Sequence, residues 1–540
     1  MTALHRDAAT VRTERSVLAV AHSVTSTTRL MDAMAALDGD LRLQCYFTEI
    51  PGATVPDGVA RFLSDLEVRE IPWEQAVRRR FDLAVSAASS GPVDQIDAPL
   101  MSIPHGAGYN KHLGAGAQVY GLSREQLLRG GRVVPSVLVL SHEGQVRQLA
   151  DQCPEALDAA LVAGDPCYDR LVAGMPWRDD YRAALGVRAD QRLVVVSSTW
   201  GAESLLGRGP EVPARLLADL PVDEYRVAAV FHPNVWHGHG VWQLRAWLAD
   251  CRRAGLLVIP PREGWRAALV AADAVVGDHG SVTLYAAALG RPVLMGFAAS
   301  GEVVAGTAMA ELGRVAPVLD HRPVDAQIEA TIARGWEGAG LSAASFAVQG
   351  RSSEVLRAEM YRLMDLAPPP GRVRVLPVPP PYPEPRRWED AERPALVASV
   401  TVEEAPGRVV FGVERIPAEV ADLRTTPRGG HLVVDGTETD HRLRGLADVL
   451  VRRHDAGHRP VFKGDEARTV AETSADGSCR VRVRDGCAVV VRARGMIDPG
   501  VLASVVHAWV ERRRLLDDLP KETVVRIGTR VLPFTWEPSG

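Results

Sequence analysis

One stretch of the chain decides the fold. Residues 272–281 have the sequence ADAVVGDHGS, and the chain continues through VTLYAAALG to RPVLM at residues 291–295. The apolar run at 274–276 predicts a buried strand, the apolar run after it predicts a helix, and Pro292 opens another strand. Gly and Ser at the start of a helix leave backbone N–H groups free to hold a phosphate. The candidate anion-binding residues are Asp278, His279, Gly280 and Ser281.

Strand-like segments on both sides of this stretch alternate with helical patterns. The predicted strands before residue 165 are 16–21, 41–47, 83–86, 100–104 and 136–140. Those after it are 193–197, 226–231, 255–259, 274–276 and 292–295. Near-continuous apolar strands joined by helices are typical of parallel sheets that are covered on both faces. We therefore expect two Rossmann-like α/β domains, 16–165 and 166–366, with a ligand cleft between them and a helix at 352–366 that completes the second.

The composition changes after residue 366. Residues 368–370 and 377–385 are rich in proline, which favours extended polyproline II. We interpret residues 367–392 as a semi-rigid linker, with an SH3-type ligand as the alternative.

A smaller accessory α+β domain is expected at residues 393–540. Its predicted strands are 395–402, 408–413, 480–484 and 487–494, with a hairpin turn at Asp485-Gly486 and a helix that starts at Asp498-Pro499. This domain shows no catalytic motif, so we consider it a possible surface for a protein partner. Residues 1–15 are polar and charged, and we expect a flexible N-terminus.

The composition narrows the classes of function. With 46% hydrophobic and 24% charged residues, the chain is typical of a globular protein. A net charge of −5 argues against a general binder of nucleic acids or anionic membranes. The polar N-terminus is no signal peptide, and no apolar run approaches the roughly 20 residues of a membrane span. We expect a cytoplasmic protein with free cysteines, the alternative being a disulfide between Cys479 and Cys487.

Five loops that follow predicted strands carry polar residues suited to chemistry. They contain His105, Gly106 and Lys111; Gly164, Pro166 and Asp169; Ser198, Thr199 and Trp200; His232 and Pro233; and the turn at 278–281. The carboxyl ends of parallel strands meet at one edge of a sheet, so these loops are expected to gather around one ligand. A histidine can accept a proton near neutral pH, and hydroxyl groups can bind phosphate oxygens. Asp169 is interpreted as a helix cap.

A metal site is the alternative interpretation of one loop. His237 and His239 lie close to His232 in the sequence, but no carboxylate accompanies them at ligand spacing. We therefore predict no metal and no cofactor.

Together, these motifs resemble the CDP-glycerol glycerophosphotransferase family, which has a GT-B fold. The resemblance covers roughly residues 16–366. The family's His-Gly loop with a following Lys matches His105-Gly106 and Lys111, and its Gly-x-Pro-x-x-Asp segment matches Gly164, Pro166 and Asp169. Its Pro-Thr-aromatic loop is similar to 198–200, its His-Pro pair to 232–233, and its Asp-x-Ser-Ser turn to 278–281. The implied fold is a GT-B-like pair of Rossmann-like domains with a central cleft, followed here by the accessory α+β domain.

The resemblance also implies roles for the site residues. His105 would act as general base on an acceptor hydroxyl, and His232 would bind the donor's phosphates and stabilise the leaving nucleotide. Lys111 would supply charge on the acceptor side. The donor's phosphates and nucleotide would be held by Ser198, Thr199, Asp278, His279, Gly280 and Ser281.

The chain departs from the family pattern at three places. Gly201 stands where the family carries Arg, Val230-Phe231 replace an Arg-containing segment, and an expected Asp is replaced around Leu284-Tyr285. The missing arginines remove positive charge, and each charge-assisted contact contributes typically ~1.5–3 kcal/mol, so a diphosphate donor would bind more weakly. The donor would therefore differ from CDP-glycerol, or activity would be absent.

Some of the same regions also resemble motifs of the non-hydrolysing UDP-N-acetylglucosamine 2-epimerases. The similar segments are 278–294 and 231–234. Those enzymes carry a His-x-Glu-Ala-Gly segment in their first domain, whereas this chain has His105-Gly106-Ala107-Gly108 and lacks the Glu.

Three hypotheses follow from the sequence. The first is a GT-B transferase that moves a nucleotide-activated polyol phosphate or sugar onto a hydroxyl acceptor. The second is a catalytically degenerate GT-B module that binds a nucleotide-linked ligand or a protein. The third is an epimerase-like isomerase that acts on a nucleotide sugar.

Overall fold

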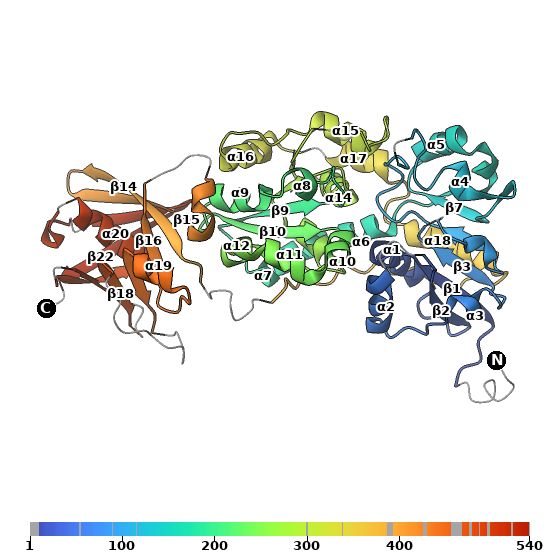
Figure 1. Ribbon diagram of the computed structural model, residues 1–540, viewed down its shortest axis with the longest axis horizontal. Coiled ribbons are helices and arrows are strands. Elements are labelled where there is room, and N and C mark those ends of the chain that lie inside the picture. Colours follow the sequence, from blue (N-terminus) through green and yellow to red (C-terminus); the bar gives the residue numbers. More distant parts are fainter. Residues whose placement is uncertain are drawn as a thin grey trace.

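The computed structural model arranges the chain as three lobes in a row (Figure 1). It describes residues 10–52, 56–88, 90–114, 116–298, 301–336, 338–385, 393–424, 429–454, 467–474, 478–484, 486–493, 497–512, 514–519 and 522–538. Most of the predicted flexible N-terminus, residues 1–9, lies outside these ranges, as do 386–392 of the predicted linker and Asp485 of the predicted hairpin turn.

The first lobe is built on a parallel sheet of order β2-β1-β3-β4-β7-β8. Its strands are β1 (Arg15–Ala21), β2 (Leu43–Glu49), β3 (Leu83–Ser86), β4 (Leu100–Ser102), β7 (Val137–Leu140) and β8 (Ala160–Val162). Its helices are α1 (Val24–Met34), α2 (Pro56–Asp65), α3 (Trp73–Ala76), α4 (Arg124–Leu127) and α5 (Gly144–Gln152), and β5 (Leu128–Arg129) pairs with β6 (Arg132–Val133). All five strands predicted before residue 165 are present.

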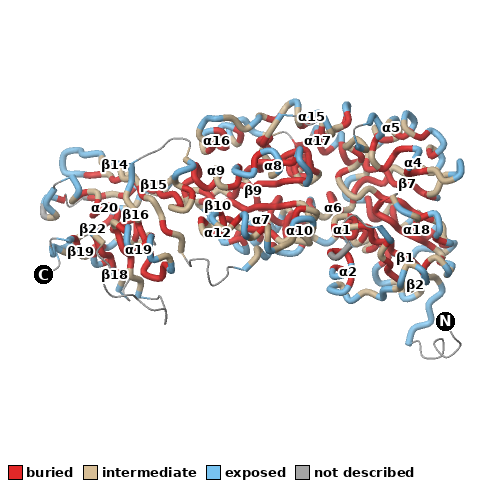
Figure 2. The backbone as a smooth tube through the Cα atoms, viewed as in Figure 1, coloured by how far each residue is buried: buried red, intermediate tan, exposed pale blue. Residues whose placement is uncertain are grey.

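The second lobe contains another parallel sheet, of order β11-β10-β9-β12-β13. Its strands are β9 (Arg192–Ser198), β10 (Tyr225–Phe231), β11 (Leu257–Ile259), β12 (Ala274–Gly277) and β13 (Val293–Met295). Its helices are α6 (Pro166–Gly174), α7 (Arg178–Ala184), α8 (Leu205–Arg208), α9 (Val212–Asp219), α10 (Pro233–His239), α11 (Val241–Trp247), α12 (Ala249–Arg253), α13 (Trp265–Ala271), α14 (Ser281–Ala288), α15 (Ala308–Val315), α16 (Val324–Arg334) and α17 (Gly338–Ser345). The strand–turn–helix–strand unit predicted around residues 272–295 is β12-α14-β13. Buried backbone concentrates in both sheets (Figure 2).

The helix predicted to complete the second domain packs in the first. This helix, α18 (Ser352–Leu363), buries Leu356, Met360 and Tyr361 in the same apolar core as β1 and β3. The Tyr361 hydroxyl donates a hydrogen bond to the Asp40 carboxylate at 2.6 Å. An amphipathic pattern predicts that one helix face is buried but not which sheet it covers, so the sequence assigned α18 to its neighbour along the chain.

The third lobe is a closed barrel of nine strands among the described residues, which is more specific than the predicted α+β domain. The strands are β14 (Leu396–Ala405), β15 (Arg408–Pro417), β16 (His431–Asp435), β17 (Val449–Arg452), β18 (Thr469–Thr473), β19 (Cys479–Val483), β20 (Ala488–Ala493), β21 (Glu522–Ile527) and β22 (Arg530–Pro538). Two helices accompany them, α19 (His441–Leu446) and α20 (Pro499–Glu511). Apolar side chains of α20 share one core with the inward-facing strand residues, so the barrel encloses this helix.

The structure contradicts the predicted disulfide alternative and places the proline-rich segment. The register of β19 and β20 places Cys479 opposite Val491 rather than Cys487, and neither cysteine is in a disulfide, so the disulfide alternative is wrong. The described part of the proline-rich segment lies against the second lobe. Val378 is buried in that lobe's core, and Glu384 pairs with Arg245 of α11 at 2.7 Å.

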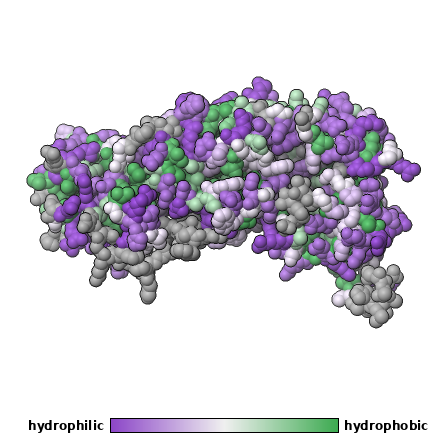
Figure 3. Space-filling view, in the orientation of Figure 1, coloured by the Kyte–Doolittle hydropathy of each residue, from purple (hydrophilic) through white to green (hydrophobic). Residues whose placement is uncertain are grey.

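The barrel is attached to the second lobe by buried contacts. The Arg415 guanidinium donates to both carboxylate oxygens of Asp223, at 2.7 and 2.8 Å, and to Asp498 at 3.0 Å. Val420, which follows β15, is buried in the core of the second lobe. The surface seen in Figure 3 is largely hydrophilic, with hydrophobic side chains scattered over it. None of the described helices has the length and apolar character that a bilayer span requires.

Candidate functional site

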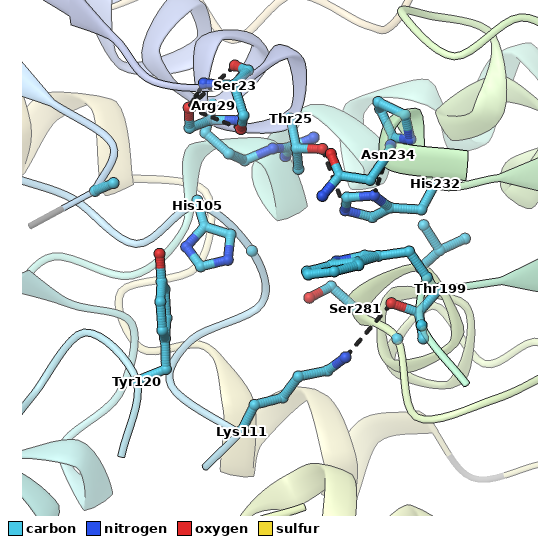
Figure 4. A pocket seen from close by; sticks show the side chains of 18 of the residues that line it. Ser23, Thr25, Arg29, His105, Lys111, Tyr120, Thr199, His232, Asn234 and Ser281 are labelled. Atoms are coloured by element: carbon cyan, nitrogen blue, oxygen red, sulfur yellow. Dashed lines mark hydrogen bonds between the residues drawn. The ribbon is translucent and has the colours of Figure 1, made fainter. Parts of the chain in front are cut away.

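A cavity of about 700 Å³ lies between the first and second lobes. Residues after β1 and β4 of the first sheet and after β9, β10 and β12 of the second line it. Both parallel sheets thus direct the carboxyl ends of their strands at one space, which is where α/β folds bind ligands. The loops of His105, Thr199, His232 and Ser281 all meet there (Figure 4).

His105 and Lys111 extend from the first lobe. The His105 ring packs edge-to-face against Tyr120, with 5.2 Å between ring centroids. Burial, followed by the nearby cations Lys111 and Arg29, lowers the pKa of His105 to about 4. The imidazole is therefore neutral at pH 7 and can accept a proton. Lys111 crosses the cavity, and its ammonium group lies 3.4 Å from the Thr199 hydroxyl.

His232 faces the cavity from the second lobe. Its Nδ1 accepts a hydrogen bond from the backbone N–H of Asn234 at 3.1 Å, so the ring caps α10. Nε2 then carries the proton of the neutral ring and donates it to Thr25 of α1 at 3.2 Å. Burial lowers the pKa of His232 to about 3, so the ring is a neutral donor at pH 7. An N–H donor at this point can bind a phosphate oxygen.

The turn after β12 has the features of an anion site. No side chain caps the start of α14, whose N-cap is Gly280, so the first backbone N–H groups of the helix have no side-chain acceptor. Gly280 and Ser281 line the cavity, and the N-terminal end of the helix dipole favours negative charge there.

Asp278 and Ser198 have structural roles in this turn. The Asp278 carboxylate accepts hydrogen bonds from the backbone N–H groups of Thr199, Leu205 and Gly280 at 2.7–2.9 Å. The Ser198 hydroxyl donates to the Thr199 carbonyl oxygen and accepts from the Leu206 N–H. Asp278 therefore joins the loops after β9 and β12 and does not line the cavity, whereas Ser198 does.

A loop of the second lobe closes one end of the cavity. His279 Nε2 lies 3.0 Å from the Glu302 carboxylate, which also pairs with Lys111 at 3.9 Å. The His112 N–H donates to the Glu302 carbonyl, and Lys111 forms an antiparallel bridge with Val303. The contacts of Lys111 and His112 join the two lobes. The hydrogen bond from the Ala107 N–H to Ser281 Oγ, at 3.2 Å, also joins them.

Positive charge reaches the cavity from an unpredicted position. Arg29 of α1 lines the cavity, with its guanidinium carbon 5.2 Å from the Trp265 ring centroid. Behind it, the buried Asp32 carboxylate accepts hydrogen bonds from both Arg170 and Arg266 at 2.7 Å. Asp32 thus faces three arginines, and Glu263 also pairs with Arg266 at 2.8 Å.

The structure brings most of the predicted site residues to one cavity. The predicted site residues that line it are His105, Lys111, Ser198, Thr199, His232, His279, Gly280 and Ser281. Asp169 instead accepts hydrogen bonds from the N–H groups of Gly350 and Ser352, so it caps the start of α18. The sequence did not single out His22, Arg29 or Glu302 for chemistry. His22 had one available signal, since it directly follows the first predicted strand.

The three neighbouring histidines of the metal alternative have different surroundings. His232 contacts Thr25, the His237 ring lies against Gly58, and the His239 ring packs on Trp247. The described part of the chain contains no group of three His, Cys, Asp or Glu side chains that could hold a metal ion.

Comparisons with known proteins find structural matches only. No protein-family model matches the chain, and no curated protein matches its sequence. The solved structures similar to it include the wall teichoic acid polymerase TagF, at 12% identity and a TM-score of 0.43, covering 66% of this chain and 90% of that one. The S. aureus MnaA–UDP co-structure matches at 10% identity and a TM-score of 0.42, covering 65% and 98%.

An epimerase structure is also among the matches. The UDP-GlcNAc 2-epimerase from Neisseria meningitidis bound to UDP-GlcNAc matches at 13% identity and a TM-score of 0.40, covering 64% of this chain and 99% of that one. The two families that the sequence motifs resemble are thus both represented among the structural matches.

Proposed function

We propose that this protein is a GT-B transferase that moves a nucleotide-activated polyol phosphate or sugar onto a hydroxyl acceptor. The observation that carries the proposal is the placement of two neutral imidazoles, His105 and His232, on opposite lobes of one cavity that also holds an uncapped helix N-terminus. A transferase needs a proton acceptor or hydrogen-bond donor near each of its two substrates, and this cavity has a neutral imidazole on each side.

The second lobe suits the donor. The N–H groups at the start of α14 and the Ser281 hydroxyl can donate to phosphate oxygens as charge develops on the leaving nucleotide. His232 Nε2–H can do the same when a phosphate oxygen replaces its present acceptor, Thr25. Lys111 and Arg29 supply positive charge to the same space. They supply positive charge in place of the arginines that the resembled family carries at Gly201 and at Val230-Phe231.

The first lobe suits the acceptor. His105 stands there as a neutral ring able to contact an acceptor hydroxyl. A neutral imidazole on this side accepts the proton of the acceptor hydroxyl while the oxygen attacks the transferred group. The bond between that group and the nucleotide phosphate breaks, and its electron pair stays on the phosphate oxygen. Glu302 is the one carboxylate among the described residues that line the cavity, and it is paired with His279 and Lys111. An isomerase would need acid and base groups around the sugar, so this arrangement favours transfer.

Thermal shift with nucleotides tests the proposal. CDP, UDP, GDP and their activated derivatives are added, and a nucleotide that the cavity binds is expected to raise the melting temperature. With the donor so identified, His105→Ala should abolish release of free nucleotide while the thermal shift persists. Absence of a shift with every nucleotide would reject the transferase and the epimerase alike. A shift without turnover under any acceptor would favour the degenerate binding module.

A further inference from the structure

The cavity contains a further histidine on the acceptor side, His22. It directly follows β1, which lies between β2 and β3 in the first sheet. The ring lines the cavity although only 7% of the residue is exposed. It lines the same cavity as His105. Burial, followed by the charge of His105, lowers the pKa of His22 to about 4. A second neutral imidazole therefore lines the cavity at pH 7 on the side of His105.

Hydrogen bonds fix which nitrogen of His22 carries the proton. Nε2 lies 2.8 Å from Ser86 Oγ at the end of β3. The Ser86 hydroxyl donates its own proton to the Ala88 carbonyl oxygen at 2.6 Å. Ser86 Oγ can therefore only accept from the ring, so Nε2 is the protonated nitrogen and Nδ1 keeps its lone pair.

Nδ1 of His22 is free to contact a ligand. It has no hydrogen-bond partner in the part of the chain that the structure describes, and the residue lines the cavity. His232 differs, because the Asn234 N–H occupies its Nδ1 and Thr25 its Nε2. His105 differs in its charges, since Lys111 and Arg29 both oppose a positive charge on that ring.

We propose that Nδ1 of His22 accepts the proton of the acceptor hydroxyl, with Ser86 as its positioning residue and His105 orienting the same hydroxyl. The inference rests on the transferase function proposed above. The acceptor oxygen forms a bond to the transferred group as its proton moves to Nδ1. The bond between that group and the nucleotide phosphate oxygen breaks, and its electron pair stays on the phosphate. His22 leaves the step as an imidazolium, held by the Ser86 oxygen lone pair, and later returns the proton to water.

A glutamine substitution separates the two nitrogens. In His22→Gln, the side-chain amide can still donate to Ser86, but the acceptor at the Nδ1 position is gone. Release of free nucleotide from CDP-glycerol and UDP-N-acetylglucosamine is measured with glycerol as the hydroxyl probe. We expect a loss of about 100-fold or more, the range of general base catalysis, with the nucleotide thermal shift unchanged.

The matched control is His142→Gln. His142 follows β7 in the same sheet, outside the cavity, and its Nδ1 accepts from the Gly144 N–H. It should keep the wild-type rate. A wild-type rate in His22→Gln would overturn the role of His22 and leave the transferase standing. No nucleotide release by the wild-type protein, from these two donors or from any activated nucleotide that raises its melting temperature, would overturn both.

Ser86→Ala tests the positioning residue through the pH profile. Without the Ser86 lone pair, the imidazolium of His22 is less stable, so the acid limb of the rate profile should move to lower pH as the rate falls. A lower rate with an unmoved acid limb would mean that Ser86 acts only in packing.

Diethyl pyrocarbonate gives a readout that needs no turnover. It modifies neutral imidazole nitrogens, so peptide mapping should find His22 modified well before His232, and nucleotide addition should protect it. Faster modification of His232 than of His22 would contradict the assignment of Nδ1 as the free nitrogen.

Discussion

At the scale of single residues, the cavity depends on close approach between the two lobes. A Cβ atom added to Gly106 would lie 2.5 Å from Ser281 Oγ, the atom that accepts the Ala107 N–H. The glycine in the His-Gly loop is therefore required for close contact with the second lobe. The same short separation brings His105 near the start of α14.

The Gly106 contact can be tested by a double-mutant cycle. Gly106→Ala should displace the Ser281 hydroxyl and cost about 1 kcal/mol of unfolding free energy through the lost hydrogen bond. Ser281→Ala leaves only an ordinary contact with Cβ at 3.5 Å, so Gly106→Ala should cost little in that background. Urea unfolding of the four proteins measures the coupling. Equal costs in both backgrounds would contradict the contact.

The histidines of the cavity predict a dependence of stability on pH. His105 has a folded pKa of about 4 against its ordinary 6.5, so the unfolded chain binds more protons between those values. Stability should therefore be lost as the pH falls from about 6.5 towards 4. Urea unfolding at pH 7 and 4.5 should show a smaller loss in His105→Gln than in the wild-type protein. The same loss in both proteins would contradict the prediction.

Sequence reasoning identified loop residues better than helix residues. His105, His232 and Ser281 follow predicted strands, and the edge of a parallel sheet gathers such loops whatever the details of packing. Arg29 lies inside α1 and Glu302 lies on a long connection, so only the tertiary fold shows that they reach the cavity. Asp278 was predicted to bind the ligand because the sequence cannot distinguish a carboxylate that accepts backbone hydrogen bonds from one that faces a cavity.

At the scale of elements, the strands were predictable and their partners less so. Continuous apolar runs locate the ten strands predicted in the two parallel sheets, because parallel strands are buried on both faces. In the barrel, β16, β17, β18, β21 and β22 were missed. β16, β17 and β18 have only four or five residues, and most residues of β22 are not buried, so none of these four gives a long continuous apolar run. The helical face of α18 was visible, but the sheet that it covers was not.

Asp169 is the element-scale feature that anchors α18. Its carboxylate accepts from the Gly350 N–H at 2.6 Å and the Ser352 N–H at 3.0 Å. Asp169→Ala should lower the unfolding free energy by about 1–2 kcal/mol, the usual cost of a lost helix cap. Glu354→Ala is the matched control, because its ion pair with Arg351 is largely exposed and should contribute below about 0.5 kcal/mol. Comparable losses in the two variants in urea unfolding would argue against the cap.

At the scale of the whole molecule, the barrel is held as part of one body. Arg415 is 5% exposed and joins Asp223 of the second lobe to Asp498 at the start of α20. A buried guanidinium that loses a partner is costly because its charge remains in a poorly solvated place.

Asp223→Ala should therefore uncouple the barrel from the second lobe. We expect a loss of about 3 kcal/mol and a separate unfolding transition for the barrel in scanning calorimetry. Arg530→Ala is the control, since Arg530 lies 3.7 Å from Asp190 in a more exposed pair, and it should keep the wild-type transitions. A wild-type calorimetric trace for Asp223→Ala would show that the apolar contacts of Val420 suffice to hold the barrel.

The return of α18 to the first sheet has a consequence during synthesis. The core around β1 and β3 includes Leu356, Met360 and Met364, whereas the last strand of that sheet ends at Val162. About 200 residues must be added between those points, which takes roughly 10–40 s at the usual rate of translation. During that interval the first lobe is tethered to the ribosome with one apolar face uncovered, because α18 has not yet been synthesised. A chain cut at the boundary between the two lobes would lack α18 and keep that face uncovered, so the first lobe is complete only when the chain beyond the second lobe has been made.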